Sequence, residues 1–83
     1  MEYEYLFTKT LHEGLKERIK GRIFCKVIND ILVIDIDTKE GINYGSTIGN
    51  FAEKLQRGEL TQEKLVDEVV KEYKKKVLST FFY

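Results

Sequence analysis

The chain has 83 residues, of which 42% are hydrophobic and 34% are charged. That length suits one domain with a single core, and that composition argues against both a membrane protein and a disordered chain. Fourteen Lys and Arg residues balance fourteen Asp and Glu residues, so no overall field would attract a polyanion. We therefore expect one domain over residues 1–83, in which any nucleic-acid binding depends on a local patch.

The cysteine content and the N-terminal residues indicate a compartment. A single cysteine, Cys25, excludes an internal disulfide framework and suits a reducing environment. Glu2 and Glu4 stand where a signal peptide would carry positive charge, and no apolar run approaches the length of a membrane span. We expect a cytoplasmic protein without a membrane partner.

Residues 2–8 show a two-residue alternation of side chains. Tyr3, Tyr5 and Phe7 would share one side, with acidic Glu4 on the other. This period is typical of a half-buried strand. The sequence therefore predicts that the chain opens with a strand.

A short helix is predicted next. Thr10 and Glu13 have the spacing of a capping box, which satisfies backbone N–H groups at a helix start. Gly21 can adopt the left-handed conformation that ends a helix. The apolar positions between them recur every four residues, at Leu11, Leu15 and Ile19.

The clearest signal is a pair of β-branched runs, residues 22–28 and 31–37, which flank Asn29 and Asp30. Both turn residues tolerate positive φ, as a two-residue hairpin requires. Closing the hairpin there would pair Val27 with Leu32, Cys25 with Ile34, and Ile23 with Ile36 on one buried face. The opposite face would hold four more apolar side chains, those of Phe24, Ile28, Ile31 and Val33. We expect something to cover that face too.

Two helices are predicted in the second half of the chain. Residues 38–46 read as a loop with room for a short edge strand. Ser46 or Thr47 can cap a helix that Gly58 ends, and Thr61 can cap a last helix. The stripe of the first comprises Ile48, Phe51, Ala52 and Leu55. The stripe of the second comprises Leu65, Val66, Val69, Val70, Tyr73 and Val77, and this helix continues to about Leu78.

The predicted fold is therefore α+β with the order β-α-β-β-α-α. It contains a small three-stranded sheet whose hairpin packs against helices. Because residues 31–37 form the most apolar strand, we place that strand centrally, between the strands over residues 2–8 and 22–28. A right-handed crossover would connect the two outer strands.

The sequence offers no convincing catalytic, cofactor or metal site. His12 and Cys25 are the one pair that could act as base and nucleophile, but Cys25 falls on the inward face of the hairpin and His12 in the first, solvated turn of a helix. One cysteine and one histidine do not make a zinc site. Residues 35–41 lack the spacing of a calcium loop, and the glycines before residue 50 lack that of a phosphate loop.

A local basic cluster leaves one alternative open. Its members are Lys16, Arg18, Lys20, Arg22 and Lys26. On a helix end and the strand that follows, these side chains could converge on nucleic-acid phosphates. Ion pairs within the helix and its dipole also explain them as a solvated surface, which is the interpretation we favour.

Aromatic residues gather at both ends of the chain. The chain has five Tyr and five Phe, and six of these lie near a terminus: Tyr3, Tyr5, Phe7, Phe81, Phe82 and Tyr83. Chain ends normally fray, so these rings must dock somewhere. We expect Phe7 and Phe81 to dock within the domain. Tyr3, Tyr5, Phe82 and Tyr83 are our candidates for an interaction surface with a partner or a second copy.

The segment Ile48-Gly49-Asn50-Phe51-Ala52-Glu53-Lys54-Leu55, followed by a Lys-rich helix ending in Phe-Phe-Tyr, resembles small phage and prophage proteins of Gram-positive bacteria. The stretch from Gly21 to Phe24 adds to this resemblance. The resemblance implies a protein that binds host or phage proteins, including inhibitors of bacterial defence systems. It implies no site residues.

These observations favour a non-enzymatic protein-protein interaction module, which the resemblance would make a phage-encoded modulator or inhibitor. A homo-oligomer is compatible with the same features. The alternative is an accessory protein that binds nucleic acid through the basic cluster. We expect no cofactor in either case.

Overall fold

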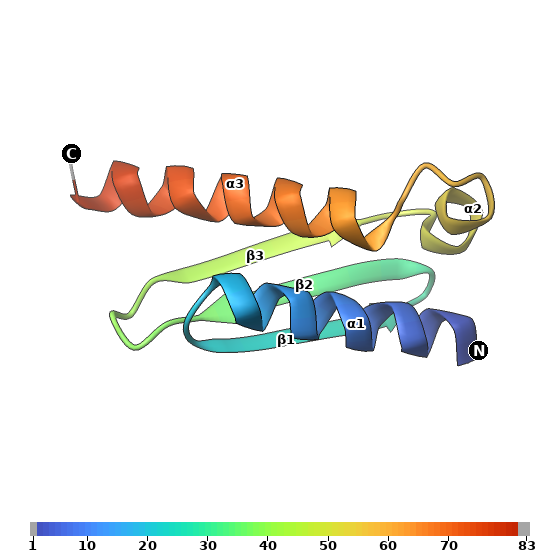
Figure 1. Ribbon diagram of the computed structural model, residues 1–83, viewed down its shortest axis with the longest axis horizontal. Helices are drawn as coiled ribbons and strands as arrows, with labels where there is room; N and C mark the ends of the chain where they lie inside the picture. Colours follow the sequence, from blue (N-terminus) through green and yellow to red (C-terminus); the bar gives the residue numbers. More distant parts are fainter. Residues whose placement is uncertain (1, 82–83) are drawn as a thin grey trace.

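The computed structural model describes the backbone of residues 2–81 and the side chains of residues 2–79. Six elements follow one another along the chain: α1 (Glu2–Arg18), β1 (Arg22–Ile28), β2 (Ile31–Asp37), β3 (Asn43–Ile48), α2 (Phe51–Gln56) and α3 (Gln62–Phe81) (Figure 1). The α+β class is confirmed, and so is the succession of a first helix, the hairpin and two further helices, with one additional strand, β3, after the hairpin. No helix within the described residues is long and apolar enough to cross a membrane.

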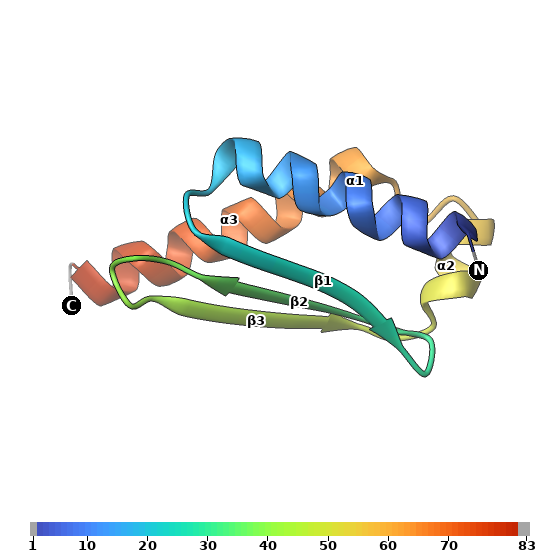
Figure 2. The same ribbon diagram turned by 90° about the horizontal axis from the view of Figure 1, so that it is seen from below.

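The three strands form one antiparallel sheet in the order β1-β2-β3. All three helices lie on the same side of this sheet, and no described segment crosses its other side (Figure 2). Among the described residues, no segment of the chain therefore provides the cover expected for the second face. The domain has two layers, with its core between helices and sheet.

The hairpin between β1 and β2 has the predicted register. Cys25 lies opposite Ile34, with Ile23 opposite Ile36 and Val27 opposite Leu32. Asn29 and Asp30 have φ values of 50° and 61°, the left-handed conformation that a two-residue turn of this kind needs. The central position of β2 is confirmed as well.

The predicted strand over residues 2–8 is wrong, because these residues form the first turns of α1. Thr10 is consequently not a helix cap: its hydroxyl donates to the carbonyls of Leu6 and Phe7 inside the helix. Phe7 also fits the helical period of Leu11 and Leu15, so one continuous stripe packs all three against the core, with Phe7 partly buried and the two leucines fully buried. Tertiary packing thus overrides the local alternation.

The third strand is β3 (Asn43–Ile48), an edge strand that overlaps the segment in which the sequence left room for one. A second antiparallel pairing therefore replaces the predicted crossover. Thr38 closes the short loop between β2 and β3. Its hydroxyl oxygen accepts from the N–H of Ile42 at 3.2 Å, and its carbonyl accepts from Gly41 N–H at 3.0 Å. A local connection costs less chain entropy than a long crossover.

The core lies between the sheet and the helices. Its fully buried members are Leu11, Leu15, Ile23, Leu32, Ile34, Ile36 and Phe51. Phe7 packs edge-on against Phe51 with 5.4 Å between ring centroids, as the expected docking of Phe7 requires. The burial of alternate residues on β2 follows from the pleat, which sends successive side chains to opposite faces.

The start of α2 is fixed by the hairpin turn. Asp30 accepts from the N–H of Phe51 through its carbonyl, at 3.0 Å, and from the N–H of Ala52 through its carboxylate, at 2.7 Å. Neither Ser46 nor Thr47 caps this helix, since both lie within β3. The side chain that caps α2 is therefore distant in sequence, where no local pattern could reveal it.

α3 begins as predicted. The N–H of Lys64 donates to the hydroxyl of Thr61 at 3.3 Å. The helix packs against α1 where Gly14 allows a close approach, since a Cβ there would lie 3.2 Å from Val66. Four residues of its stripe are buried, namely Leu65, Val66, Val69 and Val70.

Candidate functional site

The most prominent surface feature is the uncovered side of the sheet, which we call the open face. Its apolar members are Phe24 and Ile28 of β1 and Ile31 and Val33 of β2. Phe24 is 57% exposed, Ile28 47% and Ile31 40%, whereas the alternate residues of β2 are fully buried. Large apolar side chains clustered in this way mark a binding surface in many soluble proteins.

The register shows how the open face is arranged. Ile28 and Ile31 face each other beside the hairpin turn, and Val33 lies across from Lys26. Phe24 lies across from Asp35, which in turn faces Gly45 of β3. The face is therefore apolar near the turn and mixed with charge toward the other end of the sheet.

The structure describes the terminal aromatic residues of α1 but only part of those at the other end of the chain. Tyr3 and Tyr5 are 61% and 66% exposed on α1, so they remain interface candidates. Phe81 lies in the last turn of α3, and its side chain is outside the described part, as are Phe82 and Tyr83 altogether. The predicted docking of Phe81 and the predicted role of the last two residues thus concern positions that the structure does not describe.

The fold divides the predicted polyanion patch. Arg22 lines a hollow together with Lys39. Arg18 forms an ion pair with Asp67 of α3. Lys26 lies on the open face, while Lys16 and Lys20 line a hollow at the end of α1. Because the residues alternate over helix and strand faces, neighbours in sequence separate in space.

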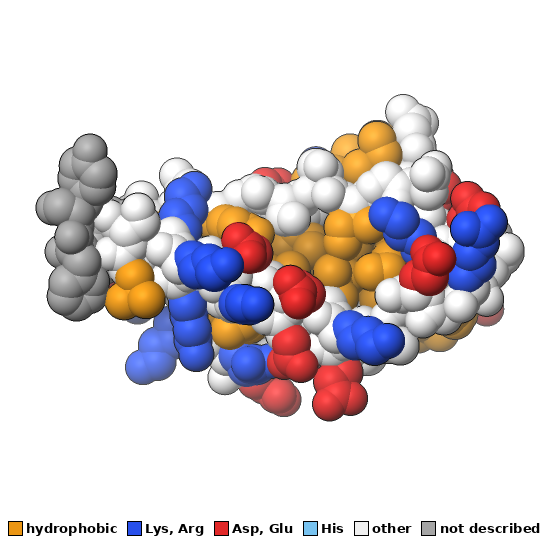
Figure 3. All heavy atoms as spheres, turned by 90° about the horizontal axis from the view of Figure 1, so that it is seen from above, with side chains coloured by type: hydrophobic (Ala, Val, Ile, Leu, Met, Phe, Trp, Pro, Cys, Tyr) orange, Lys and Arg blue, Asp and Glu red, His pale blue; other side chains and the backbone are white. Residues whose placement is uncertain are grey.

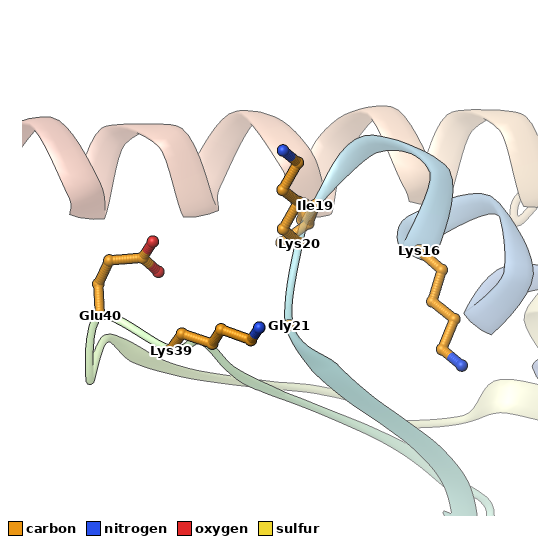
Figure 4. A pocket seen from close by; sticks show the side chains of 6 residues that line it. All are labelled: Lys16, Ile19, Lys20, Gly21, Lys39 and Glu40. Atoms are coloured by element: carbon orange, nitrogen blue, oxygen red, sulfur yellow. The ribbon is translucent and has the colours of Figure 1, made fainter.

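The hollow at the end of α1 gathers a different basic group, with Lys39 of the β2–β3 loop beside Lys16 and Lys20 (Figure 4). The side chains do not converge: Lys20 points toward α3, Lys39 toward Gly21, and Lys16 away from both (Figure 4). Glu40 also lines this hollow. An anion there would meet a carboxylate as well as the ammonium groups, which weakens the case for phosphate binding.

Sequence reasoning missed Lys39, because it lies in the loop after β2 and belongs to no periodic pattern. The tertiary fold brings this loop to the turn after α1, where Gly21 has a φ of 147°. A Cβ at this glycine would lie only 2.6 Å from the carbonyl oxygen of Asp37. These two turns approach each other closely only because residue 21 is a glycine. Gly21 is therefore the one sequence feature that could have suggested the contact.

The lysines of α3 form a solvated surface rather than a site. Basic side chains gather toward the C-terminal end of this helix, and acidic side chains join them toward its middle (Figure 3). Lys75 pairs with Glu72 at 3.5 Å, and Lys76 donates to the carbonyl of Asn43 and lies 5.8 Å from the centre of the Tyr44 ring. The Lys75–Glu72 pair lies within α3, whereas the two contacts of Lys76 hold α3 against β3.

The environment of Cys25 disfavours nucleophilic chemistry. Cys25 packs against the core, as the hairpin predicted. Burial, with a smaller contribution from the negative charge of Asp35, raises the pKa of the thiol to about 11. A reactive cysteine needs a lowered pKa instead. His12 is half-buried rather than solvated, and no hydrogen bond reaches its buried Nε2 among the described residues.

We expect alkylation of Cys25 by iodoacetamide to be slower in the folded protein than in the chain unfolded by urea. The folded-state rate should keep rising with pH toward about 11, whereas the unfolded chain should level off near 9.0. The neutral thiol stabilises the fold below pH 9.0, and this contribution is lost as the pH rises toward 11. A folded-state plateau near pH 9 would contradict the buried environment.

Acidic residues do not form a metal site within residues 2–81, where no group of three potential ligands occurs. Asp35 and Asp37 are exposed at the end of β2, on the side away from the core. Gly45 lies within β3 and Gly41 occupies a turn with a φ of 80°. Turn and strand geometry therefore explains these glycines.

The fold and the open face define a small two-layer α+β protein with one uncovered side of its sheet. Comparison of the chain with protein families, curated proteins and solved structures finds no match.

Proposed function

We propose that the protein is a non-enzymatic module that binds another protein through the open face. The observation that carries the proposal is the exposure of Phe24, Ile28 and Ile31 on a sheet face that no described segment covers. Removing such side chains from water contributes about 25 cal/mol per Å² of apolar surface, enough to drive association. Lys26 and Asp35 on the same face would orient the partner.

The resemblance to phage proteins enters the same proposal as a context. We propose that the partner is a host or phage protein, which this protein would modulate or inhibit. Such a partner would present an apolar surface to the region around the hairpin turn, where Ile28, Ile31 and Val33 meet. Its rim would meet the charged end of the open face.

The test is a pair of substitutions on β2, Ile31→Thr and Val33→Thr, which keep a β-branched shape but reduce the apolar surface. Tagged wild-type protein should capture a partner from a lysate of a Gram-positive host, identified by mass spectrometry. The double variant should bind the purified partner at least about tenfold more weakly, since each lost methyl group contributes on the order of 1 kcal/mol.

The matched control is Leu6→Ser combined with Leu78→Ser. These leucines are 58% and 55% exposed but lie on α1 and α3, away from the open face. The control should bind like the wild type, and both double variants should unfold at nearly the same denaturant concentration. Equal binding by the β2 variant and the wild type would rule out the open face.

Nucleic-acid binding is the alternative function. Lys16, Lys20 and Lys39 are the basic residues that the fold brings together. Gel shifts across a salt series separate the two functions, because each phosphate contact steepens the loss of affinity with salt. Salt-sensitive binding that the substitution of these three lysines by glutamine removes would favour the alternative.

A further inference from the structure

We propose that two copies of this chain associate through the outer edge of β1, which pairs antiparallel with the β1 strand of the second copy around a two-fold axis at Cys25. This pairing would join the two three-stranded sheets into one and leave both open faces on the same side. Its backbone contacts use the strand edge and not the open face, so it does not depend on the proposed partner site, although Phe24 and Lys26 would take part in both.

The outer edge of β1 is uncovered. In Figure 2 this edge faces the viewer, and no other segment passes in front of it. The two-residue turn joins Ile28 to Ile31, and backbone groups along an antiparallel strand point alternately to one side and the other. The N–H and C=O groups of Ile23, Cys25 and Val27 therefore point outward. Among the described residues, none of these groups bonds outside its own sheet.

The edge of β3 differs. α3 lies alongside this strand, with 6.4 Å between the ring centroids of Tyr73 and Tyr44. Lys76 donates to the carbonyl of Asn43 at the start of the same strand. An added strand would have to compete with these contacts, whereas β1 offers its whole length of seven residues. Pairing of β1 with itself also closes the assembly, which β1-to-β3 pairing would not.

The sequence of β1 is self-complementary in one register. With Cys25 on the axis, all seven residues pair, Arg22 with Ile28, Ile23 with Val27, and Phe24 with Lys26. The three residues with outward backbone groups then pair among themselves. Phe24 and Lys26 lie on the open face, where the ammonium group and the ring attract each other.

The neighbouring registers are less favourable. An axis at Lys26 would set it against the partner's Lys26, and an axis at Phe24 would set Arg22 against the partner's Lys26. Lysine in an edge strand commonly prevents unwanted pairing. Here Lys26 lies one residue from the middle of β1, and this position excludes the registers in which like charges would meet.

Charge on α1 supports the same arrangement. α1 runs alongside β1 in the opposite direction (Figure 2). Its first turn carries Glu2 and Glu4. Its last turn carries Lys16, beside Arg18, whose charge is already paired with Asp67 of α3. The two-fold axis places the acidic end of one α1 toward the basic end of the other, which is the complementarity that an isologous contact requires.

Incomplete burial beside the edge also points to this surface. Cys25 and Val27 face the core but stay partly exposed, whereas Ile23 on the same strand is buried. A hollow of about 310 Å³ adjoins them, and Tyr5 of α1 lines it. A second copy would cover these side chains.

The first test is sedimentation of the full-length protein over a concentration series at low ionic strength. Wild type should show a reversible monomer–dimer equilibrium. Phe24→Lys should dimerise about tenfold more weakly than Phe24→Glu, because each dimer contains two contacts with the partner's Lys26. Adding Lys26→Glu to Phe24→Lys should restore dimerisation. Both single variants lose the same ring from the open face, but they also change the contact with Asp35 across the hairpin. The rescue by Lys26→Glu is therefore the result that reports the register.

Ile31→Thr with Val33→Thr serves as the control, because it changes the open face but not β1. It should dimerise like the wild type, so loss of the partner and loss of the dimer are separable. A wild type that stays monomeric throughout the series would overturn the proposal, and so would equal dimerisation of Phe24→Lys and Phe24→Glu.

The second test needs no substitution. Amide hydrogen exchange of the wild type, followed by NMR, should slow at Ile23, Cys25 and Val27 as protein concentration rises. The amides of Phe24 and Lys26 already bond within the sheet, so their exchange should show no comparable dependence. Rapid exchange of the three outward amides at concentrations where a dimer sediments would refute edge pairing.

Discussion

Phe51→Ala is expected to lower the free energy of unfolding by about 3–5 kcal/mol, a large part of the ~5–15 kcal/mol typical of a folded domain. Phe51 is fully buried, and its ring packs edge-on against Phe7 with 5.4 Å between centroids. Alanine would leave a cavity where α1, α2 and the sheet meet. Urea unfolding followed by far-ultraviolet circular dichroism measures the loss.

Phe24→Ala is the matched control, since it removes the same ring from a position that is 57% exposed. It should cost no more than about 1 kcal/mol, the range of strand propensities. If the two variants lost similar stability, the contrast between the buried side of the sheet and the open face would be incorrect. In both variants, the slope of the unfolding free energy against urea concentration should stay at the wild-type value.

Leu11→Ala is expected to destabilise the protein by about 2–5 kcal/mol. Leu11 is fully buried in the stripe that α1 directs at the sheet. Alanine favours helices even more than leucine does, so the loss would report packing and not helix propensity. Chemical unfolding at neutral pH gives the value.

Leu6→Ala provides the comparison on the same helix, where Leu6 is 58% exposed. Its effect should stay within about 0.5 kcal/mol, as for other surface substitutions. A large loss for Leu6 with a small one for Leu11 would mean that α1 is rotated relative to the sheet. The pair therefore tests the helix that replaced the predicted N-terminal strand.

The hairpin was the most predictable part of the fold. Its register depends on local information: a two-residue turn that tolerates positive φ, and side chains that alternate on either side of it. The inward position of Cys25 followed from that register and was confirmed. The cap of α3 at Thr61 was predictable for the same reason. The Thr61 hydroxyl accepts a hydrogen bond from the N–H of Lys64, only three residues along the chain.

The N-terminal helix shows where local patterns fail. Tyr3, Tyr5 and Phe7 alternate as in a strand, yet Phe7 also fits the helical stripe that continues with Leu11. Both periods fit this short stretch, so periodicity alone could not decide between them. Contact with Phe51, a residue far along the chain, decided in favour of the helix.

The candidate sites divide in the same way. The alternation of residues 22–37 predicted which apolar side chains would lie on the second sheet face, but not that the described chain leaves this face uncovered. The basic cluster looked continuous in sequence, and the fold separated Arg18 from Lys26 while it brought Lys39 to Lys20. Neighbours on a chain share a surface only when the local period keeps them on one face.

By itself, the sequence determined the α+β class, the hairpin register and the buried face of the central strand, because these depend on turn chemistry and on a period of two within a short segment. Only the tertiary structure decided that residues 2–8 are helical, that Asn43–Ile48 supplies the third strand, and that all helices share one side. These features depend on apolar surface that segments distant in sequence bury against each other. The free energy of that burial cannot be read from a local sequence pattern.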